Sequence, residues 1–380
     1  MKQKIDYSIE NLEVIEPLVD TDNYLAEVSL AIGNAPNEVF MAYARQRGLV
    51  HSDDGDIVFV KSFNGGKTWD ESTAVSCMEK HDLWGFTSAS LKVLKNGTIL
   101  VLAHANYLSG AASNTPFGVK GAYITRSKDG GKTWSHPEGF DVHPLRRINI
   151  WDNPHELDDG TLLLAVSGTL FDPNCRGSIR ESVRCCLACS EDGGLTWYCR
   201  GTIAYDSASL HAFHEPGMAI TPDGRMIACM RQHYEFCRGN LPAGYMYTAE
   251  SDDGGYSWSQ FKNTGIWGYP IDPVVLANGY VLAAYGYRRD PLGIRIAISR
   301  DGREFSKENI GVIHSPPLVA PQKSIKTDID IGYRHIGYPS SVVREDGKVL
   351  TAFHSFNEDR RQVLRVAMYD IAIAETSGGV

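Results

Sequence analysis

The sequence predicts an all-β fold, a six-bladed β-propeller with four antiparallel strands in each blade. Two internal repeats indicate it. In the first, four segments share the pattern Ser-x-Asp/Asn-x-Gly-x-Thr/Ser-Trp and start 65, 63 and 61 residues apart. In the second, Asx-Gly turns between short β-type runs recur in phase with the first. Repeats at such a spacing mark an architecture of equal units, and four-stranded units arranged radially form a propeller.

The first repeat predicts the turn between the third and fourth strands of a blade. Its copies begin at Ser62, Ser127, Ser190 and Ser251, and a degenerate fifth copy begins at Ser299. In such a turn the Asp or Asn side chain accepts hydrogen bonds from backbone amides, and a Gly adopts positive φ. The Trp is large enough to pack between neighbouring sheets. Each copy follows a run with the composition of a β-strand.

The second repeat predicts the hairpin between the first and second strands. Asx-Gly pairs between β-type runs favour two-residue hairpin turns. The predicted turns are Asn96-Gly97, Asp159-Gly160, Asp223-Gly224, Asn278-Gly279 and Asp346-Gly347. The segment 33–37 has the same role near the start of the chain, which makes six hairpins and therefore six blades.

The last unit lacks an Asp-containing turn after its third strand, 364–370. We therefore expect Leu12–Val19 to supply the outer strand of the last blade and to close the ring. Six units of this size use the whole chain, so we predict a single domain over residues 1–380.

Composition limits the classes of partner. The formal net charge is −9, hydrophobic residues make up 43% and charged residues 22%. These values are ordinary for a folded globular chain. No basic stripe is present to hold a nucleic acid, and no apolar run is long enough to cross a bilayer. The composition leaves the oligomeric state open.

The N-terminal residues contain no apolar stretch of a signal peptide, which favours the cytoplasm. A secreted or periplasmic location is expected instead if a signal peptide was removed. Seven of the eight cysteines lie between Cys175 and Cys237. Cys186 and Cys189 have CxxC spacing, but in a strand they point to opposite faces. We interpret the cysteines as small buried hydrophobic residues and expect neither a metal nor a cofactor.

Strand direction brings polar side chains to one rim. The first strands of the blades begin there and the second strands end there. Residues at the starts of the first strands are Glu27, Phe86, His155, Glu215, Asp272 and Tyr338. Residues at the ends of the second strands are Arg45, His104, Ser167, Arg231, Arg288 and His354. Such a gathering is costly to desolvate unless it has a function. It predicts a polar pocket for a hydroxyl-rich ligand, with Trp84, Phe86 and Tyr269 stacking on a sugar ring.

The repeats and these rim residues resemble the sialidase superfamily, whose hallmark is the repeated Asp-box on a six-bladed propeller. The resemblance implies a tyrosine nucleophile made basic by a glutamate, an aspartate as acid/base, and three arginines that hold the substrate. Gly337-Tyr338-Pro339 resembles the segment of the nucleophile, and His214-Glu215-Pro216 that of the glutamate. Arg231 and Arg288 correspond to two of the arginines. In the loop after Arg45, either Asp53 or Asp54 corresponds to the acid/base.

The first arginine of the family is missing. It belongs to an Arg-Ile-Pro motif on the first strand of the first blade, where this chain has Tyr24-Leu25-Ala26-Glu27. A glutamate cannot replace the bidentate pairing of an arginine with a carboxylate. This departure disfavours sialic acid itself as the substrate.

Three functions follow from these residues. The first is a sialidase-like exo-glycoside hydrolase that retains configuration, with Tyr338, Glu215 and Asp53 or Asp54 as catalytic residues. Its substrate-binding residues would be Arg231, Arg288, Arg45, His155, His104, Asp272 and Trp84. The second is a polysaccharide lyase, or an enzyme for uronate, rhamnose or arabinose ends, with Tyr338 as acid/base. It would use His104, His155, His214 and His354. The third is a propeller that binds carbohydrate without catalysis.

Overall fold

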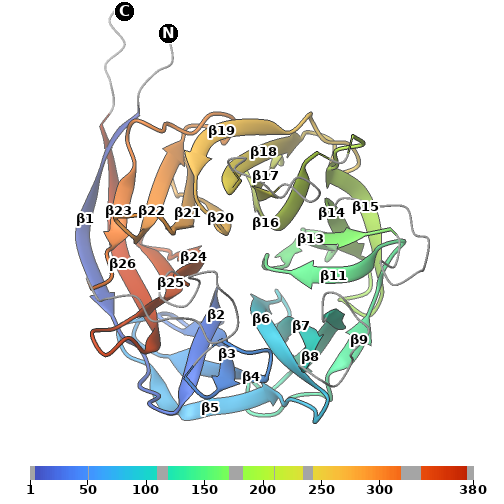
Figure 1. The fold of residues 1–380 in the computed structure, drawn as a ribbon, viewed down its shortest axis with the longest axis vertical. Helices are drawn as coiled ribbons and strands as arrows, with labels where there is room; N and C mark the ends of the chain where they lie inside the picture. Colours follow the sequence, from blue (N-terminus) through green and yellow to red (C-terminus); the bar gives the residue numbers. More distant parts are fainter. Residues whose placement is uncertain are drawn as a thin grey trace, which may run out of the picture.

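The computed structural model describes residues 5–49, 51–108, 119–170, 183–208, 210–233, 243–317 and 335–374. Six sheets surround a central axis, as Figure 1 shows, and this confirms the six-bladed propeller. In the described part of the chain, no helix is long and apolar enough to span a membrane.

The blades follow one another along the chain, and in each the first strand is innermost. Blade 1 contains β2 (Asn23–Ile32), β3 (Val39–Arg47), β4 (Gly55–Ser62) and β5 (Asp70–Met78). Blade 2 contains β6 (Trp84–Val93), β7 (Ile99–Tyr107), β8 (Val119–Ser127) and β9 (Glu138–Phe140). Blade 3 contains β11 (Arg146–Ile150), β12 (His155–Glu156), β13 (Leu162–Thr169), β14 (Arg184–Ser190) and β15 (Trp197–Ala204), with β10 (Val142–His143) parallel to β15.

The second half of the ring repeats this pattern. Blade 4 contains β16 (Ala212–Ile220), β17 (Met226–His233), β18 (Tyr245–Ser251) and β19 (Lys262–Trp267). Blade 5 contains β20 (Ile271–Val275), β21 (Val281–Tyr287), β22 (Gly293–Ser299) and β23 (Gly311–His314). Blade 6 contains β24 (Gly337–Val343), β25 (Val349–Phe356), β26 (Gln362–Ala374) and, on its outer edge, β1 (Asp6–Ile15).

The N-terminal strand closes the ring, as the sequence predicts, although it lies a few residues earlier than 12–19. β1 pairs antiparallel with β26 from Asp6 opposite Ala374 to Ile15 opposite Val366 (Figure 1). Tyr7 extends the closure to blade 5, because its hydroxyl lies 3.2 Å from the Ile296 carbonyl and accepts the Gly311 amide at 2.8 Å. The first and last strands thus hold the ring together.

The repeated turns have the predicted hydrogen bonds. In the second copy Asp129 accepts the Thr133 amide at 3.0 Å and the Thr133 hydroxyl at 2.6 Å. The Trp134 indole donates to the Gly131 carbonyl and packs on the Phe59 ring of the preceding blade. Gly131 has φ +86°, and a Cβ there would lie 2.3 Å from that ring. The glycine is therefore required both for the turn and for contact between blades.

The core is divided into six hydrophobic clusters, one at each interface between blades. Cys186 belongs to the cluster between blades 2 and 3 and Cys189 to the cluster between blades 3 and 4, which confirms that they point to opposite faces. Both are free and buried. Cys175 and Cys237 lie outside the described residues.

Replacement of Tyr7 by Phe tests the closure. The variant keeps the aromatic ring of residue 7 but loses the hydroxyl that contacts blade 5, so we expect the free energy of unfolding to fall by about 1–2 kcal/mol. Chemical denaturation measures it. The matched control is Tyr256→Phe, because the Tyr256 side chain is exposed. Equal stability of the two variants would contradict the role given to Tyr7.

Candidate active site

A β-bulge near the start of the innermost strand shapes the site in four blades. Glu27, Ser88, Glu215 and Tyr338 have φ angles of 54°, 54°, 50° and 51°. Each lies where the register with the second strand shifts. A left-handed backbone at a non-glycine residue costs on the order of 1–3 kcal/mol and occurs where the fold enforces it, often at functional sites. A bulge also redirects its side chain.

These four residues line one pocket on the axis, together with Trp151 and Asp272. Each of these six residues comes from a different blade. The pocket is therefore a product of the closed ring.

Tyr338 and Glu215 meet in this pocket. The Tyr338 hydroxyl donates to Glu215 Oε1 at 3.2 Å, and Arg231 Nη1 donates to the same oxygen at 3.0 Å. Burial raises the pKa of the Tyr338 phenol well above its usual value, the Glu215 charge raises it further, and the Arg288 charge opposes both. The phenol is thus protonated at rest. Glu215 Oε2 is buried and has no hydrogen-bond partner among the described residues.

Two arginines lie on one aromatic ring beside this pair. The guanidinium carbons of Arg231 and Arg288 are 4.1 and 4.9 Å from the centre of the Tyr269 ring. Arg288 is also 5.3 Å from the Tyr338 ring centre, and its Nε donates to the Ile336 carbonyl at 2.9 Å. Tyr269 therefore positions both cations on the Tyr338 side of the pocket.

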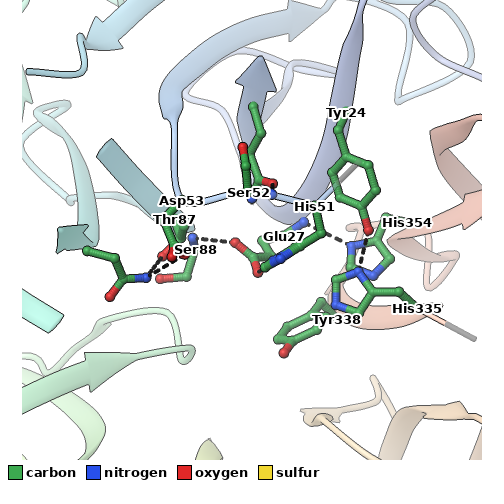
Figure 2. A network of polar contacts seen from close by, with 12 residues as sticks. Tyr24, Glu27, His51, Ser52, Asp53, Thr87, Ser88, His335, Tyr338 and His354 are labelled. Atoms are coloured by element: carbon green, nitrogen blue, oxygen red, sulfur yellow. Dashed lines mark hydrogen bonds and ion pairs between the residues drawn. The ribbon is translucent and has the colours of Figure 1, made fainter. Parts of the chain in front are cut away.

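Glu27 is the centre of a second network, which Figure 2 shows. Its Oε2 accepts the Ser88 amide at 2.8 Å, and its Oε1 lies 3.8 Å from His51 Nε2. Burial is the largest single influence and favours a higher pKa for the Glu27 carboxyl, but His51, the Ser88 amide and His104 together leave the pKa below its ordinary value. Glu27 is therefore an ionised carboxylate inside the pocket.

Three histidines near Tyr338 are buried in the neutral form. Burial lowers the pKa of His354 to about 3, and it lowers the pKa values of His335 and His104. The His354 and His335 ring centres are 5.2 and 5.7 Å from that of Tyr338. His354 Nδ1 accepts the Glu27 amide at 3.1 Å, so its proton is on Nε2. That Nε2 has no hydrogen-bond partner in the described part of the chain.

The two candidate acid/base residues differ in position. Asp53 Oδ1 accepts from Asn106 Nδ2 at 3.1 Å, and Asn106 also donates to Thr87, next to the bulge residue Ser88 (Figure 2). Asp54 Oδ1 lies 2.6 Å from Lys80 Nζ in an ion pair. Asp53 is thus held beside the blade 2 bulge, whereas Asp54 is engaged by Lys80.

Arg45 does not join the cluster. In the other blades His104, Arg231 and His354 lie opposite the residue just before the bulge, and in blade 1 this position is Ala44. Arg45 is one residue further on, so it points to the other face, where it pairs with Asp56 at 3.4 Å. The expected position for Arg45 is wrong by one residue.

The aromatic residues expected to stack on a sugar are also engaged by protein. Phe86 lies two residues before the bulge and is fully buried in the core between blades 1 and 2. Trp84 stacks on the rings of His81 and Tyr123. Phe86 therefore does not line the pocket, and Ser88 takes the place expected for it.

His155 and Asp272 have internal partners. His155 lies in β12, below the rim, with its Nε2 3.7 Å from Asp152 Oδ2. Asp272 Oδ2 accepts the Ser341 amide at 2.6 Å. His214 precedes the bulge at Glu215, and its ring contacts that of His233.

Several pocket residues were not expected from the sequence. The Trp151 ring is 4.7 Å from that of Tyr338 and 5.0 Å from that of His104. His51 and His335 lie within the Glu27 network (Figure 2). His51 is in the loop from which Asp53 and Asp54 were selected, so its proximity to them was the available signal. No group of three or more His, Cys, Asp or Glu side chains in the described segments is arranged to hold a metal ion.

The ring and its axial pocket define a sialidase-type propeller. The model of the BNR repeat-like domain matches residues 53–351, so the chain belongs to this family and is a divergent member of the sialidase superfamily. No curated protein sequence matches significantly.

Solved structures share the fold. A protein of unknown function from Dyadobacter fermentans is 23% identical, with a TM-score of 0.76, over 96% of this chain and 99% of that one. The NanB sialidase from Streptococcus pneumoniae is 12% identical, with a TM-score of 0.64, over 93% of this chain and 70% of that one. The intramolecular trans-sialidase from Ruminococcus gnavus is 12% identical, with a TM-score of 0.63, over 92% and 94%.

Asp272 makes stability depend on pH. Burial raises the pKa of its carboxyl from 3.8 to about 8, and the Ser341 hydrogen bond only partly opposes this. The folded state then keeps a proton that the unfolded state releases, so this contribution to stability is lost as pH rises from 3.8 to about 8. Asp272→Asn removes this loss. Denaturation midpoints from pH 5 to 8 measure it, with exposed Asp252→Asn as control. Parallel profiles for Asp272→Asn and the wild type would contradict the assignment.

Proposed function

We propose that this protein is a glycoside hydrolase that releases a terminal sugar with retention of configuration, with Tyr338 as the nucleophile. The observation that carries the proposal is the contact between the Tyr338 hydroxyl and Glu215 Oε1, shared by Arg231. A buried phenol needs a base to become a nucleophile, and a carboxylate at hydrogen-bond distance is such a base. The shared fold with sialidases supports the same reading.

The first step forms a glycosyl-tyrosine. Tyr338 Oη attacks the anomeric carbon as its proton passes to Glu215, and the bond to the leaving oxygen breaks. Asp53 gives its proton to that oxygen. Arg231 and Arg288 stabilise the negative charge that the Tyr338–Glu215 pair shares.

The second step reverses the roles. Asp53 takes a proton from water, the water oxygen attacks the anomeric carbon, and the bond to Tyr338 Oη breaks. Glu215 returns the proton to the phenolate. Two inversions at the anomeric carbon give net retention.

Replacement of Tyr338 by Phe tests this mechanism. It removes the nucleophilic oxygen and keeps the ring that packs on Trp151, so we expect kcat to fall at least about 100-fold. A panel of chromogenic glycosides provides the activity. The matched control Tyr280→Phe changes a tyrosine of the hairpin turn in blade 5 and should keep full activity. Cleavage by Tyr338→Phe at the wild-type rate would exclude Tyr338 as the nucleophile. If the wild type binds a sugar but cleaves none, and Tyr338→Phe binds it equally well, the protein is a binding propeller.

A polysaccharide lyase is the second candidate, because of the neutral His354 beside Tyr338. A lyase needs a base for the proton next to the uronate carboxylate and an acid for the leaving oxygen. The neutral His354 has its proton on Nε2 and its Nδ1 already accepts the Glu27 amide, and the Tyr338 phenol is protonated, so Glu215 would first have to take the Tyr338 proton.

Absorbance separates the two candidates. A lyase forms an unsaturated uronate that absorbs in the near ultraviolet, whereas a hydrolase consumes water and forms no double bond. We expect no rise in absorbance with uronate polymers such as polygalacturonate. A rise that disappears in His354→Gln would establish the lyase instead.

A further inference from the structure

Glu27 has the same backbone position in blade 1 that Glu215 has in blade 4 and Tyr338 in blade 6. All three are bulge residues with positive φ, and all three line the axial pocket. Two of these positions hold the proposed nucleophile and its base. A buried carboxylate at a strained backbone position in the same pocket is a candidate functional residue.

The charges of the pocket are divided between two sides. Arg231 in blade 4 and Arg288 after blade 5's second strand lie together on Tyr269. Glu27 lies in blade 1, across the ring from blade 4 (Figure 1). The side with the arginines already contains the Glu215 carboxylate, bound to Arg231 at 3.0 Å.

On the Glu27 side, the group that carries positive charge is His51, and it is already paired with Glu27. His104 and His354, which contact Ser88 and the Glu27 amide, are neutral because they are buried. His51 lies beside Glu27 Oε1, and its side chain is 45% exposed. Arg231 therefore lies beside the Glu215 carboxylate and His51 beside the Glu27 carboxylate, so two positive groups of the site already have a negative partner.

We propose that the pocket takes an uncharged terminal sugar and that Glu27 selects it by accepting a hydrogen bond from a sugar hydroxyl. This inference rests on the proposed function, since it concerns the same pocket. One Glu27 oxygen is occupied by the Ser88 amide, and the other faces His51 and the pocket, so a hydroxyl donor completes its hydrogen bonds (Figure 2). A ligand carboxylate there brings like charges together and donates no hydrogen bond to Glu27.

Matched pairs of methyl glycosides test the selection by binding, which does not require turnover. Methyl galactoside and methyl galacturonoside differ only at C6, and the methyl glycoside of N-acetylneuraminic acid is compared with its methyl ester. Calorimetry or ligand-observed NMR measures each Kd. We expect the uncharged member to bind at least about 10-fold more tightly in any pair that binds, because a buried charged site discriminates strongly against an unmatched group.

The variant Glu27→Gln should reduce this preference several-fold, mainly by strengthening the binding of the carboxylated member. Glu71→Gln, which changes an exposed glutamate of β5, should leave it unchanged. The comparison of wild-type Kd values for the charged and uncharged members does not depend on whether Glu27→Gln folds. Tighter binding of the carboxylated members, or no saturable binding of any uncharged member, would overturn the inference.

The outcomes also separate this inference from the proposed function. Uncharged sugars that bind as expected but are not cleaved would end the hydrolase proposal and support the selection. If Tyr338-dependent cleavage of a sialoside is found, and the methyl glycoside of N-acetylneuraminic acid binds more tightly than its methyl ester, the hydrolase proposal is supported and the selection by Glu27 is excluded.

Discussion

The site depends on how the innermost strands satisfy the backbone amides that face the axis, both at their bulges and beyond them. Each bulge interrupts the hydrogen bonds between first and second strands, and a buried amide without a partner is costly. A side chain of a neighbouring blade supplies the acceptor. At the blade 2 bulge Glu27 accepts the Ser88 amide, and three residues beyond the bulge residues Glu215 and Tyr338 the Met218 amide donates to Asp152 and the Ser341 amide to Asp272. Buried acidic side chains around the axis thus connect blade to blade, and two of them, Glu27 and Asp272, also line the pocket.

Asn153 connects the blades through the axis itself. Its Oδ1 accepts from the Ser29 hydroxyl at 2.7 Å and from the Leu91 amide at 3.1 Å, and its Nδ2 lies 3.3 Å from Ser340 Oγ. One side chain of blade 3 therefore contacts blades 1, 2 and 6. Because the pocket residues come from all six blades, such contacts fix the distances between groups that are far apart in the sequence, such as Glu215 and Tyr338.

The sequence predicted the fold well and the site in part, and the bulges explain the difference. Turn chemistry is local, so Asp129 and the Asx-Gly pairs were enough to count blades and assign strand order. Register is not local. A bulge changes the face of every residue beyond it, so Ala44 and Ser88 occupy places where Arg45 and Phe86 were expected. Tyr338 and Glu215 were identified correctly as neighbours because both are themselves bulge residues, and their segments resemble those of the sialidase superfamily.

The neutral form of the histidines could not be predicted, because it follows from burial that only the closed ring creates. The same burial explains why a tyrosine would suit the proposed mechanism in a pocket for an uncharged sugar. A phenol is neutral before it reacts, whereas an aspartate or glutamate nucleophile would add a third carboxylate to Glu27 and Glu215. Like charges in one desolvated site raise one another's pKa and would leave such a nucleophile protonated. In the proposed mechanism Tyr338 avoids this, because its proton leaves only as the new bond forms.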